Sequence, residues 1–167
     1  RYPTAGGASR EYSQPLYVNS PYGISISHNG NLVNTEELAK ELNKDNYRHL
    51  NTSSDSEVIL NVFAHELQKA GSFNPSPEEI FTAVEKTHLR LKGAYSVLLM
   101  ISGVGLVAIR DPKGIRPLIL GKKDNDLIGA DYMIASESPA LSALEFEIEG
   151  DLKPGEAVLI TPQGKLY

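Results

Sequence analysis

The sequence contains no cysteine and no tryptophan in its 167 residues. The lack of cysteine excludes a disulfide, a thiolate metal site and a cysteine nucleophile within these residues. No apolar run approaches the ~20 residues that a membrane-spanning helix requires. The net charge of −5 is the opposite of the basic excess expected of a general nucleic-acid-binding protein. We therefore expect neither a nucleic acid nor a membrane among the binding partners.

The remaining composition is that of an ordinary folded domain. Hydrophobic residues make up 41% and charged residues 22% of the chain, and its length suits one domain. The sequence has no phosphate-binding G-x-x-x-x-G-K-[ST] loop and no dinucleotide-binding fingerprint. The four histidines lack the spacing of metal ligands on one helix or strand; they are His28, His49, His65 and His88. We therefore expect no metal and no cofactor in this chain.

The first half of the chain predicts three helices, at about residues 34–42, 54–71 and 76–91. Each starts with an Asn or Ser that can cap the helix and has a Glu three residues later. These pairs are Asn34 with Glu37, Ser54 with Glu57 and Ser76 with Glu79. Apolar residues at helical spacing follow each start, so each helix has one face for a core.

Strands are expected before these helices and throughout the second half. Residues 15–18 and 24–28 form a predicted hairpin, and residues 95–101 are a near-continuous apolar run typical of a strand buried on both faces. Further strands are expected at 106–109, 118–120, 132–135, 145–148 and 157–160, with a short helix starting at 138. Helices followed by a strand-rich half indicate an α+β fold with layered antiparallel sheets.

Asn29 and Gly30 are the most informative pair in the chain. An Asn-Gly dipeptide after a strand is typical of a tight turn, and by itself predicts a turn here. The same pair can also offer a side-chain amide and a backbone N–H to a developing oxyanion. Arg1 and Thr4 can bind a carboxylate, and Asp55 can bind an ammonium group. Together these groups suit an amino-acid substrate, although Arg1 is equally an exposed residue and Asp55 equally a helix-start carboxylate.

Four segments carry a family resemblance: Arg-Tyr-Pro-Thr-Ala-Gly at 1–6, His-Asn-Gly-Asn-Leu-Val-Asn at 28–34, Ser-Asp-Ser-Glu at 54–57 and Arg-Asp-Pro-Lys-Gly-Ile-Arg-Pro-Leu at 110–118. In this order they resemble the glutaminase domain of amidotransferases with an N-terminal cysteine, most closely the amidophosphoribosyltransferase family. The resemblance implies the four-layer α-β-β-α sandwich of N-terminal nucleophile hydrolases. It also implies that residues 1–167 are a partial glutamine amidotransferase type 2 domain, incomplete at its N-terminus.

The resemblance also implies a role for each candidate residue. The Asn29 amide and the Gly30 N–H would form the oxyanion hole, Arg1 and Thr4 would bind the α-carboxylate of L-glutamine, and Asp55 would bind its α-ammonium group. The parent enzyme would pass the released ammonia to phosphoribosyl pyrophosphate and form 5-phosphoribosylamine, in the first committed step of purine synthesis. It would be a cytoplasmic homo-oligomer.

The chain departs from this family in two respects. The family attacks glutamine with a cysteine at the mature N-terminus, whereas residue one is arginine here and no cysteine is present. The phosphoribosyltransferase domain, where magnesium is expected, would follow Tyr167. We therefore expect a segment that is inactive alone and that aggregates through uncovered sheet edges when it is expressed in isolation.

Three alternatives remain open at this stage. The parent could be another amidotransferase of the same class, such as a glucosamine-6-phosphate synthase or an asparagine synthetase, which carries a segment similar to 110–118. The chain could also be a non-catalytic module that binds glutamine. Within 110–118, residues 111–114 predict a type I turn, while Arg110, Lys113 and Arg116 could instead attract a phosphate group.

Overall fold

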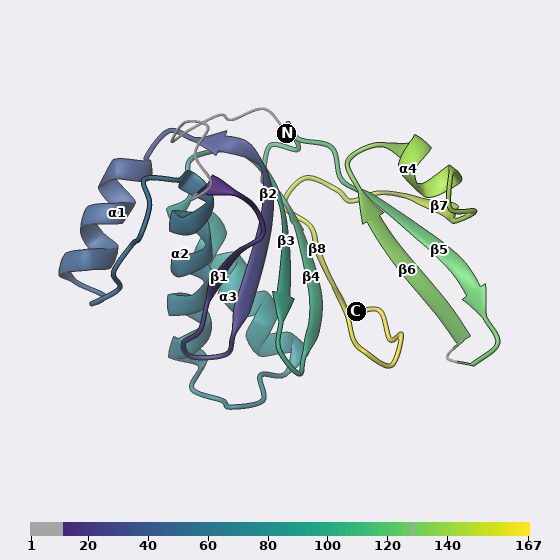
Figure 1. The fold of residues 1–167 in the computed structure, drawn as a ribbon, viewed down its shortest axis with the longest axis horizontal. Coiled ribbons are helices and arrows are strands. Elements are labelled where there is room, and N and C mark those ends of the chain that lie inside the picture. Colours follow the sequence, from purple (N-terminus) through teal and green to yellow (C-terminus); the bar gives the residue numbers. More distant parts are fainter. Residues whose placement is uncertain (1–11, 128) are drawn as a thin grey trace.

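The computed structural model describes residues 12–127 and 129–167. Three helices cover one face of a five-stranded sheet, and a three-stranded sheet with a short helix lies on the other side (Figure 1). The helices are α1 (Thr35–Lys44), α2 (Asp55–Ala70), α3 (Pro77–Arg90) and α4 (Ser138–Ser142). The strands are β1 (Leu16–Val18), β2 (Ile24–Leu32), β3 (Gly93–Ile101), β4 (Gly105–Arg110), β5 (Ile119–Asn125), β6 (Gly129–Ala135), β7 (Glu147–Asp151) and β8 (Ala157–Ile160).

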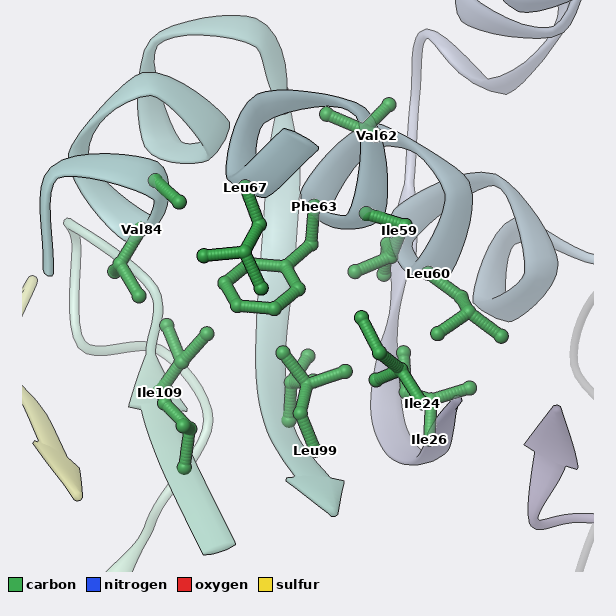
Figure 2. Packing of buried hydrophobic residues seen from close by; sticks show 14 of the residues in the cluster. Ile24, Ile26, Ile59, Leu60, Val62, Phe63, Leu67, Val84, Leu99 and Ile109 are labelled. Atoms are coloured by element: carbon green, nitrogen blue, oxygen red, sulfur yellow. The ribbon is translucent and has the colours of Figure 1, made fainter. Parts of the chain in front are cut away.

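The larger sheet has the order β1-β2-β3-β4-β8, and every neighbouring pair is antiparallel. Its main core lies between this sheet and helices α2 and α3. Figure 2 shows Phe63 and Leu67 of α2 pointing toward Leu99 of β3, with Ile24 and Ile26 of β2 beside them. All five side chains are fully buried, and each such burial stabilises the fold by about 1.5–3 kcal/mol. The helices therefore pack against one face of β2 and β3 and hold these two strands in place.

The smaller sheet has the order β6-β5-β7 and packs on the larger one through a second core. The buried members of that core are Ala108, Leu118, Ile134 and Leu152. On the opposite face of β5, a Cβ at Gly121 would lie 2.9 Å from the buried Leu141 of α4, so α4 forms a further layer. The layers run helix, sheet, sheet, helix, which confirms the expected α-β-β-α order. In the described residues the fourth layer consists of α4 alone.

The prediction that β3 is buried on both faces is wrong. Val97, Leu99 and Ile101 are buried against the helices, but Leu98 is only partly buried and Met100 is 51% exposed on the other face. The second sheet covers Leu98 and leaves Met100 open. The other predicted strands are confirmed with shifted ends, and β5 and β7 continue past their expected limits.

The prediction of a turn at Asn29 and Gly30 is also wrong. The pair lies inside the nine-residue strand β2, with Asn29 opposite Ser96 and Gly30 opposite Tyr95 of β3. Gly30 has a φ of +143°, and a Cβ there would lie 2.0 Å from the carbonyl oxygen of Ala94. The neighbouring strand therefore requires this glycine, and no reversal of the chain does.

The expected reciprocal cap of α2 does not form. Ser54 is the N-cap, but its side chain accepts from the backbone N–H of Ser56. The Glu57 carboxylate instead accepts the backbone N–H groups of Asn51 and Thr52, at 2.8 and 2.7 Å. Glu57 thus holds the loop before α2 because that loop brings two unpaired donors within its reach.

The other two helix starts divide in the same way. At α3 the capping box of Ser76 and Glu79 is present, with hydrogen bonds of 2.7 and 3.3 Å. At α1 the N-cap Asn34 makes no side-chain cap and spans to the end of α3, where it binds the Arg90 carbonyl and the Lys92 N–H. Among the described residues, none of the helices combines the length and apolar character needed to cross a membrane.

Candidate active site

Within the described residues, no strand pairs with one edge of β2 beyond Ile26, and this edge is called the open edge below. Strand β3 pairs with β2 along its whole length, whereas β1 pairs only with Ile24–Ile26. Backbone N–H groups alternate between the two edges of an antiparallel strand. Val33 donates to the Lys92 carbonyl on the β3 side, so the even-numbered residues of β2 point their N–H groups to the open edge.

Side chains occupy two of these edge positions. The His28 N–H donates to Oε1 of Gln14 at 2.8 Å, and the Leu32 N–H donates to Oδ2 of Asp55 at 3.2 Å. Gly30 lies midway between them, and the uninterrupted β2–β3 register points its N–H to the same edge. The structure therefore places a backbone donor between an amide and a carboxylate.

Asp55 is held where helix α2 meets this edge. It is the first residue of α2, next to the positive end of the helix dipole, and is 1% exposed. Its second oxygen, Oδ1, lies 3.7 Å from Nδ1 of His28. The helix-start interpretation of Asp55 is confirmed, and the same carboxylate faces the β2 edge. Its binding of an ammonium group stays a prediction.

Asn29 projects from a different side of β2. Side chains alternate along a strand, so Asn29 and Ser27 are exposed while His28 and Gly30 are buried toward the helices. Asn29 lines a cavity of about 260 Å³, together with Gln14, Ser96, Leu118 and Ser136 among others. Its side-chain amide makes no hydrogen bond to another described residue, so it can serve a bound molecule.

His28, Ser56 and Gln14 form a group that the sequence reasoning missed. Nδ1 of His28 is 3.0 Å from Oγ of Ser56, which also accepts from Nε2 of Gln14 at 2.7 Å. His28 directly precedes Asn29 in the sequence, and Ser56 directly follows Asp55. This adjacency to predicted site residues is the one sequence signal that points to them. Gln14 lies before the predicted hairpin, and no motif in the sequence marks it.

The segment 110–118 forms a turn that is held mainly by hydrogen bonds between its own residues. The guanidinium of Arg110 donates to the backbone carbonyls of Arg116 and Gly114, each at 2.8 Å, and to that of Leu152. The buried Asp111 carboxylate accepts three backbone N–H groups of the same loop. This confirms the turn and leaves Arg110 committed to carbonyl groups, so the phosphate alternative is wrong for Arg110.

This turn is hydrogen-bonded to Tyr95 of β3, the strand that pairs with β2. The Asp111 N–H donates to the Tyr95 carbonyl at 2.8 Å, and Tyr95 lies opposite Gly30. The Tyr95 hydroxyl lies 2.7 Å from Nδ1 of His88 on α3. Burial raises the pKa of Tyr95 and lowers the pKa of His88, so the neutral phenol donates and the neutral imidazole accepts.

Two of the predicted site residues, Arg1 and Thr4, lie outside the described residues, and their roles stay predictions. The structure brings the other three predicted residues, Asn29, Gly30 and Asp55, to one end of β2. No group of three or more His, Cys, Asp or Glu side chains suited to a metal ion occurs within 12–127 and 129–167.

Comparison with protein families assigns the chain to a class. A family model for the glutamine amidotransferase domain matches residues 7–143. The chain therefore belongs to the glutamine amidotransferase domain family.

The similar individual proteins are amidophosphoribosyltransferases. That of Pseudomonas aeruginosa is 56% identical over the whole chain, and that of Escherichia coli is 52% identical. That of Saccharomyces cerevisiae is 48% identical over 96% of the chain. The chain spans about a third of the length of these relatives, at 33%, 33% and 31%.

Two solved structures share the fold. The glutamine phosphoribosylpyrophosphate amidotransferase of B. subtilis, complexed with ADP and GMP, has a TM-score of 0.73 and 31% identity, over 95% of this chain and 32% of its own. A structure described as the allosteric regulatory enzyme of purine biosynthesis has a TM-score of 0.75 and 33% identity, over 100% of this chain and 33% of its own. These similarities confirm the expected N-terminal nucleophile hydrolase architecture.

Proposed function

We propose that this chain binds glutamine for hydrolysis of its side-chain amide, as the glutaminase part of an amidophosphoribosyltransferase. The observation that carries the proposal is the open edge of β2, where the Gly30 N–H lies beside the carboxylate of Asp55. An amide hydrolase for a free amino acid needs a donor for the oxyanion and an anion for the ammonium group. The family membership and the relatives' names support the same assignment.

Asp55 would bind the α-ammonium group of glutamine through Oδ1, because Oδ2 already accepts from Leu32. The carboxylate is nearly fully buried, so pairing adds little desolvation of the carboxylate itself, and the remaining desolvation cost is that of the ammonium group. Arg1 and Thr4 would bind the α-carboxylate, as the motif at 1–6 suggests. Glutamine would then be held at its α-carbon, with its side-chain amide directed toward Asn29 and Gly30.

The Asn29 amide and the Gly30 N–H would stabilise the oxyanion. A nucleophile adds to the side-chain carbonyl carbon, the carbon–nitrogen bond breaks, and ammonia leaves after gaining a proton. Water then hydrolyses the acyl-enzyme to glutamate. The attacking thiolate would come from residues outside this stretch, since the sequence contains no cysteine. Without such a residue, the 167-residue chain alone would release no ammonia.

In the full protein the ammonia would displace pyrophosphate from phosphoribosyl pyrophosphate and give 5-phosphoribosylamine. That step would take place in a second domain, where magnesium would be expected to support pyrophosphate as the leaving group. Residues 1–167 would then be part of a glutamine amidotransferase type 2 domain in a cytoplasmic, homo-oligomeric enzyme. Glutamine consumption that rises with phosphoribosyl pyrophosphate, and not with fructose-6-phosphate or aspartate with ATP, would separate this parent from the related amidotransferases.

The site assignment is tested by Asn29→Ala in the full-length natural protein. Loss of one oxyanion donor should lower kcat for ammonia release from glutamine by about 100-fold, with little change in KM. Ser27→Ala is the matched control, because Ser27 is exposed on the same face and lines the same cavity. Equal kcat values for the two variants would contradict the assignment, and a wild-type protein that releases no ammonia from glutamine would contradict the proposed function.

A further inference from the structure

Gln14 lies just before β1 and reaches β2 through its side chain. Leu16 is the first residue of β1 and lies opposite Ile26, whereas residues 14 and 15 form a bend outside the strand. The side-chain Oε1 of Gln14 accepts the His28 N–H at 2.8 Å. The side chain therefore takes the place of a strand at the start of the open edge.

The other end of the same amide reaches helix α2. Nε2 of Gln14 donates to Oγ of Ser56 at 2.7 Å, and that oxygen lies 3.0 Å from Nδ1 of His28. The backbone N–H of His28 can only donate, so the Gln14 amide must turn its oxygen to His28 and its nitrogen to Ser56. The three residues close a ring of hydrogen bonds, and rotating the amide by 180° would place two donors against each other at His28.

We propose that Gln14 is a positioning residue for glutamine hydrolysis, an inference that rests on the proposed function. His28 precedes Gly30 by two residues on the same edge of β2, and Ser56 directly follows Asp55 on α2. The Leu32–Asp55 hydrogen bond links β2 to α2 on one side of Gly30, and the amide of Gln14 adds a second link on the other side. Together the two links fix the distance between the oxyanion donor and the carboxylate. Misplacing either group by about 1 Å is enough to lower a rate by about 100-fold.

The chain offers a matched control for this role. The Tyr12 hydroxyl lies 3.0 Å from Oγ of Ser53, so a second hydrogen bond joins the same two segments without touching His28 or Ser56. If these hydrogen bonds only attached the segment before β1 to the start of α2, Tyr12→Phe and Gln14→Met would lower kcat alike. A positioning role affects Gln14→Met alone, since methionine keeps the volume of glutamine and removes both hydrogen bonds.

The experiment measures ammonia release from glutamine by the full-length natural protein. Gln14→Met should lower kcat by about tenfold or more with KM changed by less than about threefold, and Tyr12→Phe should stay within about twofold of wild type. The double variant Gln14→Met/Ser56→Ala should be no slower than Gln14→Met, because the two residues act as one unit. A wild-type kcat in Gln14→Met, or additive losses in the double variant, would overturn the proposal while leaving the proposed function intact.

Amide hydrogen exchange gives a readout that does not depend on activity. Gln14→Met should speed exchange of the His28 amide by about tenfold, whereas Gln14→Glu, which keeps an acceptor oxygen, should leave it within about threefold of wild type. An unchanged His28 amide in Gln14→Met would overturn the proposal. A wild-type protein that releases no ammonia would instead refute the proposed function, and the positioning role would fall with it.

Discussion

Gly30 of β2 lies directly opposite Tyr95 of β3, with the two backbones so close that a Cβ on Gly30 would lie 2.8 Å from the Cα of Tyr95. Tyr95 is in turn fixed by Asp111 at its carbonyl and by His88 at its hydroxyl. The candidate oxyanion donor is therefore set by a contact between main chains, supported by two groups behind it. Such a contact tolerates almost no displacement of Gly30.

Gly30→Ala should destabilise the pairing of β2 with β3. The added methyl group would overlap the Ala94 carbonyl, whose oxygen lies 2.0 Å from the Cβ position. We expect the local free energy of opening to fall by about 3 kcal/mol or more, seen as at least about 100-fold faster amide exchange in β3. Gly71→Ala is the control, because Gly71 also has a positive φ but has no atom within 4 Å of its Cβ position. It should cost only about 1–2 kcal/mol, and equal losses in the two variants would contradict the overlap.

Asp55→Asn should weaken the binding of the amino-acid substrate without removing the acceptor for the Leu32 N–H. Loss of a buried charge opposite an ammonium group costs about 2 kcal/mol or more, so the Kd should rise about 30-fold. Titration calorimetry with L-glutamate measures this, since the product carries the same α-ammonium group and is not consumed. Glu36→Gln removes an exposed carboxylate from the first turn of α1 and should leave the Kd unchanged. An unchanged Kd in Asp55→Asn would remove Asp55 from the site.

Acidification should loosen the region around His88. Burial lowers the pKa of His88 in the folded protein below its ordinary value, so the unfolded chain binds the proton more readily. Stability should therefore fall as the pH drops below about 6.5, the ordinary pKa of histidine, until it reaches the lowered value. His88→Gln should flatten this part of the profile, measured by amide exchange in α3 and corrected for the intrinsic pH dependence of exchange. The difference between the two proteins at pH 8 gives the pH-independent cost of the lost Tyr95 hydrogen bond. A slope that is unchanged in His88→Gln would assign the loss to other groups.

Most of the secondary structure could be predicted because its signals are local. The hairpin of 15–18 with 24–28, the capping box at Ser76 and the left-handed glycine that ends α2 at Gly71 depend on neighbours in the sequence. Asn29 and Gly30 were wrongly assigned to a turn because the reason for the glycine lies in another strand. A glycine required by a turn and one required by a neighbouring carbonyl are identical in the sequence.

The residues of the candidate site also fall into two groups, those that a local motif predicts and those that only the tertiary fold brings together. Asn29, Gly30 and Asp55 could be proposed from the sequence because each belongs to a short motif with a chemical meaning, and their roles stay predictions. Gln14 was missed because its role depends on the register of β1 and on the position of α2, which no local pattern encodes. The Ser54–Glu57 cap failed for the same reason, since Glu57 binds a loop that only the tertiary fold brings to it.

The core between the helices and the larger sheet contains many more buried residues than the core between the two sheets. The two sheets should therefore differ in local stability. Asn29, Gly30 and Asp55 belong to elements held by the large core, whereas Leu118 and Ile134, which line the cavity of about 260 Å³ together with Asn29, belong to the small one. The second sheet should therefore open as a separate cooperative unit, at lower free energy than the first. Thermal motion would then widen or narrow the cavity while leaving the groups that would carry the chemistry in place. Evolution could change what the cavity admits by altering the second sheet alone.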